Sequence, residues 1–540
     1  MECNVMNHAV CVNETVYDSV VEVPLEADIM LPDYCPDIVK ILKCTLNACV
    51  KSARAQGRTL QLEGMCSVNV LYLGEDNSGM SGSGQSGQSA LQLRSVDYKL
   101  PYSKSVDLKS EVGQVIVFVS ADSSYCSCRA VSKRRVELRA SVSHKLSVVS
   151  SGEEQVVADV AEDTQNPQGI QLRKKTMQQD AFVTQARETI SVHEELELAQ
   201  GKPPVRSVIC SNGCAVMTDH KLISGKIVTK GELRLQILYC TDQNSIEQME
   251  YALPISAVID APGADDGCVC SAGYAVCELE ILPKLGEDGQ NTRFELNAQV
   301  VATAEVCRRT EIAVADDCYS TRYACEGHNR PLSFLSLLQQ VEEKCLYKGE
   351  IELPDGVDSI IAGWGRVTDS AVSFEEENGE YKAQLHLSLN LCMLAYDDSA
   401  GIQFYDKTEK LDCSFPVSGM DAQEQRLLFC PQLTVTGFDY SRSAGALQVR
   451  CEVLVRGCIC QLKKCSVMEE IVVDEQKPIE REDDCSLTIY YADPGENLWE
   501  IAKAYHTAMQ SVLEANSQLE LSQEDAVSKR EMLLIPILSN

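Results

Sequence analysis

Cysteine is the residue with the most chemical potential in this chain, which has 26 cysteines among 540 residues. Three Cys-X-Cys pairs would place both sulfurs on the same face of a strand, where two thiolates could chelate a soft metal ion. These pairs are Cys126/Cys128, Cys268/Cys270 and Cys458/Cys460. The sequence has no Cys-X-X-Cys motif with a matching partner pair, which a structural zinc site usually needs. We therefore expect no bound metal and no cofactor.

Many other cysteines lie inside strand-like runs, where Val or Leu would serve equally well. Examples are Cys66, Cys240, Cys392 and Cys451. Residues Met1–Val23 lack a basic segment followed by an apolar run, and no stretch of the chain approaches 18 uncharged apolar residues. We expect a protein that is cytosolic where it is made, with buried, reduced thiols. Cross-linking at a later stage, in an oxidising extracellular layer, stays open.

The sequence carries none of the common catalytic motifs, since GxxxxGK(S/T), GxSxG and HExxH are all absent. Its seven histidines are scattered, and His193-Glu194-Glu195 lacks the second His of a metalloprotease motif. The 80 acidic residues include enough carboxylates for a paired-acid glycosidase, but no local spacing favours one. We expect these residues to form a solvated surface, and the chain not to be an enzyme.

Charge also limits the choice of partner. The formal net charge is -32, which opposes binding to a phosphate backbone unless basic residues are gathered on one face. Two short basic runs, Lys133–Arg135 and Arg173–Lys175, lie in strand-like or loop sequence, where we expect solvated strand faces or turns. Nucleic acid is therefore not an expected partner, and no transmembrane segment is predicted.

Internal repeats organise the chain ahead of its C-terminal segment. In each copy, an upstream Pro precedes an alternating apolar and polar run that ends in Tyr, the pattern of a half-buried strand. The three copies are Pro36/Tyr72, Pro203/Tyr239 and Pro354/Tyr396. Pro and Tyr are 36 residues apart in the first two copies and 42 apart in the third, with Glu375–Glu380 as the expected insertion. This regularity predicts three related antiparallel β domains.

The length of the chain, the repeats and the change of pattern near the end suggest the following division. Three β domains occupy 1–165, 166–330 and 331–475, a charged linker occupies 476–484, and a small module occupies 485–540. In the first domain, the loop from Gly74 to Ser89 is rich in Gly and Ser and is predicted to be a flexible hairpin tip. The predicted fold class is mainly β.

The C-terminal segment predicts the order strand, helix, helix, strand. Tyr490 and Ala492 alternate as inward positions of a first strand, which Pro494-Gly495 ends with a turn. Asn497 followed by Glu500 has the spacing of a helical capping box, and Thr507 followed by Gln510 repeats it. The second helix is expected to stop near Asn516, and Leu533–Ile535 to form a closing strand. Trp499, whose neighbours share an apolar helix face, is expected in the core of the module.

This segment resembles a LysM module. The resemblance rests on spaced residues in the order Tyr490, Pro494, Gly495, Leu498, Trp499, Ile501, Ala502, Tyr505, Leu513, Ala515, Asn516, Leu533, Ile535 and Pro536. It implies a βααβ fold and a shallow groove for glycans that contain N-acetylglucosamine, formed by two loops. The implied partner- or glycan-binding residues are Asp493, Pro494, Gly495, Glu496, Asn497, Leu498, Asn516, Ser517, Gln518 and Leu519. Asn497 in place of the usual Thr and Arg530 in place of the usual Gly depart from the family pattern.

Three β repeats with a terminal LysM resemble the SPOCS-domain proteins of endospore-forming Firmicutes, in particular spore coat morphogenetic proteins of the SipL type. The resemblance implies a non-enzymatic scaffold in the mother-cell cytoplasm, which is recruited to the forespore surface and the spore coat. It also implies that the LysM module contacts a coat morphogenetic ATPase through Gly495, Glu496, Leu498, Trp499 and Asn516. The alternative is a protein that binds peptidoglycan of the cell wall or the spore cortex.

Overall fold

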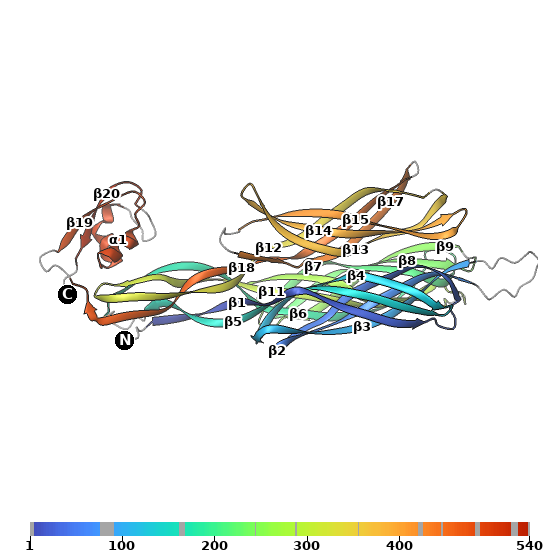
Figure 1. Cartoon of the computed structure of the whole chain (residues 1–540), viewed down its shortest axis with the longest axis horizontal. Coiled ribbons are helices and arrows are strands. Elements are labelled where there is room, and N and C mark those ends of the chain that lie inside the picture. Colours follow the sequence, from blue (N-terminus) through green and yellow to red (C-terminus); the bar gives the residue numbers. More distant parts are fainter. Residues whose placement is uncertain are drawn as a thin grey trace, which may run out of the picture.

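A computed structural model describes most of the chain. The described residues are 5–75, 91–160, 168–243, 245–286, 289–354, 356–419, 425–443, 446–480, 486–519 and 527–537. Almost all of them are strand, in antiparallel sheets, and the helical residues lie in the C-terminal module (Figure 1). The predicted fold class, mainly β, is confirmed. Most of the predicted hairpin tip in the first repeat, at 76–89, lies outside the described residues.

The first repeat forms two sheets, and we call it the first unit. Its strands are β1 (Val5–Met30), β2 (Asp37–Glu75), β3 (Leu91–Val112), β4 (Gln114–Ser132) and β5 (Arg135–Val160). β1, β5 and β4 make one sheet, and β2 with β3 makes the other. β2 reverses its direction near Gly57, whose φ of 61° suits glycine because it has no Cβ. β2 therefore supplies both arms of a hairpin.

The second and third repeats have the same plan. The second unit contains β6 (Ile170–Glu197), β7 (Val205–Ile223), β8 (Lys226–Thr241), β9 (Ile246–Asp260), β10 (Cys268–Lys284) and β11 (Arg293–Ser320). The third contains β12 (Tyr323–Glu352), β13 (Val357–Glu377), β14 (Glu380–Asp397), β15 (Gly401–Val417), β16 (Gln425–Phe429), β17 (Gln432–Ser443) and β18 (Ala446–Pro478). In each unit the first and last strands share one sheet, and the hairpin strands form another. The domain boundaries themselves stay a prediction.

A hydrogen bond explains the constant spacing between Pro and Tyr in the first two units. The Tyr72 hydroxyl donates to the carbonyl of Pro36 at 3.2 Å, and the Tyr239 hydroxyl donates to the carbonyl of Pro203 at 3.2 Å. Both rings are fully buried, with 0% exposure. This hydrogen bond forms only if the hairpin between Pro and Tyr has a set length, which explains the separation of 36 residues.

The equivalence predicted for Tyr396 is wrong. Val205 pairs with Thr241 in the second unit, and Val357 pairs with Asp397 in the third. By this register Ala395, not Tyr396, occupies the place of Tyr239. Successive side chains of a strand point to opposite faces, so Tyr396 lies on the other face and is 44% exposed.

We expect Tyr239→Phe to lower the free energy of unfolding by about 1–2 kcal/mol, because it removes the donor to a carbonyl at the start of the unit. Chemical denaturation measures the loss. Tyr396→Phe is the matched control, with an expected change within about 0.5 kcal/mol because the ring is exposed. Equal effects of the two substitutions would contradict this account.

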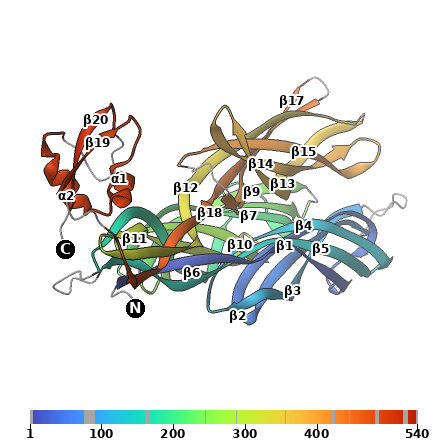
Figure 2. The same cartoon turned by 60° about the vertical axis from the view of Figure 1, so that its left-hand side comes forward.

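The three units share apolar clusters as well as having cores of their own. One cluster, which we call the junction cluster, joins the hairpin sheets of all three units. It contains Leu71 from β2, Leu238 from β8 and Leu394 from β14, all buried. A second shared cluster packs Ile116 of β4, Phe182 of β6 and Leu335 of β12 together. Figures 1 and 2 show the long strands of the units lying side by side.

The C-terminal module has the predicted order of elements. It contains β19 (Leu487–Ala492), α1 (Leu498–Ala504), α2 (Met509–Ala515), a 3-10 turn (Ser517–Leu519) and β20 (Glu531–Pro536), and β19 pairs with β20 in an antiparallel register. Asn497 caps α1 as predicted, since its Oδ1 accepts a hydrogen bond from the backbone N–H of Trp499 at 2.7 Å. The predicted cap of α2 is wrong. Ala508 holds that position, and the Thr507 hydroxyl donates to the carbonyl of Pro536.

Candidate functional site

The turn between β19 and α1 is the first half of the predicted groove. Gly495 adopts a φ of 94°, a conformation that favours glycine, and its N–H donates to the carbonyl of Val527 at 2.8 Å. The Glu496 carboxylate accepts hydrogen bonds from the Tyr490 hydroxyl and from the Asp493 backbone N–H, both at 2.8 Å. Glu496 therefore holds the turn in shape. Replacing it would disturb the turn as well as remove a surface charge.

The turn after α2 is the second half. Asn516 is buried at the end of the helix, and its Nδ2 donates to the carbonyls of Val512 and Leu534, both at 2.7 Å. Its Oδ1 accepts from the Leu534 N–H at 2.8 Å. This side chain ties the end of α2 to β20.

The ten predicted site residues thus fall into two groups. The exposed group is Asp493, Pro494, Gly495, Ser517 and Gln518. The remaining five are partly or fully buried: Glu496, Asn497, Leu498, Asn516 and Leu519. Of these, Glu496, Asn497 and Asn516 make side-chain hydrogen bonds within the module. The exposed group offers most of the surface that a ligand or partner could contact directly. Their binding role stays a prediction.

A contact between the module and the end of β11, which we call the docking contact, is a feature that the sequence did not reveal. Trp499 is only 2% exposed, and its indole N–H donates to Oδ2 of Asp317 at 2.7 Å. The Lys503 ammonium donates to both oxygens of the same carboxylate, at 2.7 and 2.8 Å. Asp317 thus accepts from two side chains on one face of α1.

Aromatic packing extends the docking contact. Tyr319, also in β11, packs edge-on against Trp499 with ring centroids 4.9 Å apart, and its hydroxyl donates to the carbonyl of Thr507 at 2.7 Å. Tyr319 belongs to the same buried cluster as the module's own core residues. Arg173 of β6 pairs with Glu500 at 3.2 Å and lies 5.9 Å from the Trp499 ring. Trp499 is therefore core, as predicted, but that core is shared with the second unit.

The docking contact also changes the acidity of Asp317. Burial alone would raise the pKa of this carboxyl, but hydrogen bonds from Lys503 and Trp499, with the charge of Lys503, lower its pKa below the ordinary value. The carboxylate form is thus the one that the contact stabilises.

The outer face of the module carries an apolar strip, which we define as Ile489, Tyr491 and Met532. They are 55%, 60% and 48% exposed, and Tyr491 pairs with Met532 across the two strands. Figures 1 and 2 show β19 and β20 on the side of the module that faces away from the β units. Contiguous apolar side chains rimmed by polar residues are typical of protein-binding surfaces.

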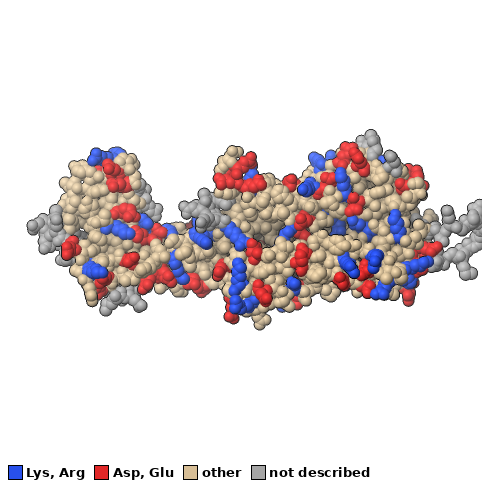
Figure 3. All heavy atoms as spheres, in the orientation of Figure 1, with Lys and Arg blue, Asp and Glu red and all other residues tan. Residues whose placement is uncertain are grey.

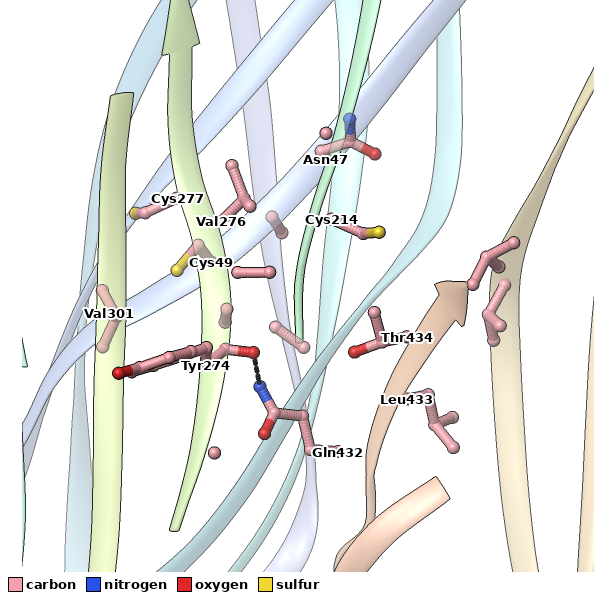
Figure 4. Close-up of a pocket in the computed structure, with 18 of the residues that line it drawn as sticks. Asn47, Cys49, Cys214, Tyr274, Val276, Cys277, Val301, Gln432, Leu433 and Thr434 are labelled. Carbon is pink, nitrogen blue, oxygen red and sulfur yellow. Dashed lines mark hydrogen bonds between the residues drawn. The ribbon is translucent and has the colours of Figure 1, made fainter. Parts of the chain in front are cut away.

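A cavity of about 940 Å³ lies where strands of all three units meet. Figure 4 shows Cys49, Tyr274 and Thr434 around it, with the Gln432 amide donating to the Tyr274 carbonyl.

Charged groups of the cavity lining bond to the protein itself. Gln185 donates to Glu305 at 3.0 Å, and Arg187 donates to the Val50 carbonyl at 3.0 Å. Burial raises the pKa of Glu305. Because these bonded groups have both signs, they do not select one class of ligand.

Charges of both signs are interspersed over the surface in Figure 3. The two basic runs follow this pattern. Arg135 pairs with Asp28, Lys174 with Asp159, and both Arg173 and Lys175 with Asp316. Lys133 and Arg134 lie in a turn and the other four residues lie in strands, as predicted.

Two further properties hold within the described ranges. No group of three or more His, Cys, Asp or Glu side chains there has an arrangement suited to a metal ion. No helix among these residues is long and apolar enough to cross a membrane.

Comparison with known proteins finds a family model that matches parts of the first two units. Residues 37–131 and 204–281 match a family model described as SipL, SPOCS domain. The matches run from β2 into β4 of the first unit and from just before β7 into β10 of the second, so they cover equivalent strands of two repeats. No curated protein matches the chain. Two of the three repeats are therefore similar to the SPOCS domain of the SipL family.

Proposed function

We propose that this chain is a non-enzymatic scaffold of spore coat assembly, whose C-terminal module binds a coat morphogenetic ATPase at the forespore surface. In this proposal the β units form a rigid body in the mother-cell cytoplasm, and the module is the adaptor. The module follows the LysM spacing of residues, and its predicted groove is one candidate contact surface.

The observation that carries the proposal is the way the module is held. The docking contact uses α1, through Trp499 and Lys503, whereas the exposed groove residues and the apolar strip lie elsewhere on the module. A partner can therefore engage the module while it remains fixed to the body. The apolar strip favours a protein as that partner over a glycan, because glycan recognition depends on hydrogen bonds as well as on aromatic stacking.

Binding of the purified ATPase to the immobilised full-length chain tests the proposal. We expect saturable binding, and a loss of affinity of about tenfold or more when Ser517→Arg is introduced into the exposed part of the groove, because a new cation and its bulk would be placed in the interface. Ser19→Arg in β1 is the matched control, since Ser19 is also exposed, and should leave binding unchanged.

A second substitution, Ile489→Asp, tests the apolar strip in the same assay. If Ile489→Asp weakens ATPase binding and Ser517→Arg does not, the contact surface is the apolar strip and the proposed scaffold function still holds. Absence of ATPase binding by the unsubstituted chain would refute the proposal, and pelleting of that chain with purified cell wall would then support peptidoglycan binding.

A further inference from the structure

Among the described cysteines, Cys44 with Cys126 and Cys318 with Cys325 bring thiols from different sheets into contact. Cys44 of β2 and Cys126 of β4 have their sulfur atoms 3.4 Å apart, and these strands belong to the two separate sheets of the first unit. Cys318 of β11 and Cys325 of β12 have theirs 3.9 Å apart, at the connection between the second and third units. The described cysteines are all free thiols.

These positions differ from those of the cysteines that only fill space. Cys66, Cys240, Cys392 and Cys451 are almost fully buried within strands, as the sequence predicts for apolar substitutes. In contrast, Cys44, Cys126 and Cys325 are only partly buried. Each of the two pairs therefore has at least one cysteine that is not fully buried.

We propose that Cys44/Cys126 and Cys318/Cys325 are oxidative modification sites, which form intramolecular disulfides when the protein meets a low-molecular-weight disulfide. A thiolate of the pair attacks one sulfur of the reagent, forms a mixed disulfide and releases one small thiol. The second cysteine of the pair then attacks the mixed disulfide and releases the other small thiol. The protein loses two protons and two electrons per pair, and the reagent is reduced to two thiols.

The environment of each pair assigns these roles. The hydrogen bond from Cys44 lowers the pKa of Cys126 and also that of nearby Cys128, and the hydrogen bond from Cys318 lowers the pKa of Cys325, in each case against the opposing effect of burial. Of the first two, Cys126 has its sulfur in contact with that of Cys44. A lower pKa gives more thiolate at neutral pH, and the thiolate is the nucleophile. Cys126 and Cys325 are thus the attacking residues, and their partners resolve the mixed disulfide.

Oxidation would add a covalent bond across each of the two contacts. The first disulfide would fix the two sheets of the first unit to each other. The second would fix the connection between the second and third units, next to Asp317 of the docking contact. This inference does not depend on which partner the module binds.

Oxidised glutathione is the probe that tests the proposal. The reduced full-length chain is treated under native conditions, remaining thiols are alkylated, and tryptic peptides are analysed by mass spectrometry. We expect linked peptides for both pairs, each with a loss of about 2 Da, to accumulate roughly tenfold faster than any adduct on Cys11. Cys11 is the control because it is also partly buried but hydrogen-bonds to Gln179.

Substitutions assign the bonds. Cys44 and Cys49 lie on one tryptic peptide, and Cys126 and Cys128 lie on another. We expect Cys44→Ser and Cys126→Ser each to abolish the link between these two peptides. Cys325→Ser should abolish the second link and leave the first, and circular dichroism checks that the variants fold. Stable glutathione adducts without linked peptides, or a link that persists in Cys44→Ser, would overturn the assignment.

Discussion

Asp317→Asn is expected to release the C-terminal module from the β units. The substitution removes the carboxylate that accepts from Trp499 and Lys503, and it leaves a buried indole N–H facing an uncharged amide. Hydrogen bonds to a charged group contribute about 1.5–3 kcal/mol each, and partial exposure of Lys503 puts its share at the low end. We expect docking to weaken by about 2–3 kcal/mol in total.

Trp499 itself can report this release. The chain has two tryptophans, so a Trp364→Phe background leaves Trp499 as the single emitter. Undocking should shift its fluorescence to longer wavelength, and small-angle scattering should show a larger maximum dimension. Glu195→Gln, which breaks the exposed ion pair with Lys284 far along the same sheet, is the control and should change neither signal. Unchanged emission in Asp317→Asn would show that the docking contact is absent in solution.

Acid should have the same effect on the unsubstituted chain. Because the docked pKa of Asp317 is lowered, its contribution is fully present above the ordinary aspartate pKa of about 3.9 and is lost as pH falls through the docked value. The fluorescence shift should therefore occur below about pH 4, and Asp317→Asn should already show it at neutral pH.

Leu394→Ala is expected to destabilise the β units together. Leu394 is fully buried, and in the junction cluster it packs with residues from the other two units. Truncation of a buried leucine costs about 2–5 kcal/mol, from lost transfer free energy and from the cavity that remains. Because the cluster joins all three hairpin sheets, the loss should lower the transition temperature of the whole body in calorimetry.

The control for this prediction is Val258→Ala in β9, a residue that is 53% exposed. We expect its effect to stay within about 0.5 kcal/mol. A separate early transition of the third unit in Leu394→Ala, with the other units unchanged, would show that the junction cluster does not couple them.

Local patterns were sufficient to predict most of the elements. Apolar and polar alternation predicted the β repeats, and the spacing from Tyr490 to Pro536 predicted the order of strands and helices in the module. The constant distance between Pro and Tyr in two units has a physical cause in one hydrogen bond per unit. Such features are visible in the sequence because the interacting residues recur at fixed separations.

Features that depend on register or on distant contacts were not predictable in this way. A shift of one residue places Tyr396 on the opposite face from Tyr239, and the alternating pattern alone does not fix the register. Its spacing from Gln510 predicts Thr507 as a cap, but its hydroxyl donates to the carbonyl of Pro536. Asp317 lies 182 residues from Trp499, and no local signal connects them. The sequence also did not predict which of the groove residues are exposed and which are hydrogen-bonded within the module.

The core of the C-terminal module depends on Tyr319, a residue of the second unit. The Tyr319 ring of the second unit completes the buried core of the module. In a fragment that contains the module alone, the face of Trp499 that packs against Tyr319 would be exposed to water. A fusion of the module to an unrelated protein would therefore also need the end of strand β11, which carries Tyr319. The module and the end of β11 thus share one core, so a substitution on either side of it affects the stability of both.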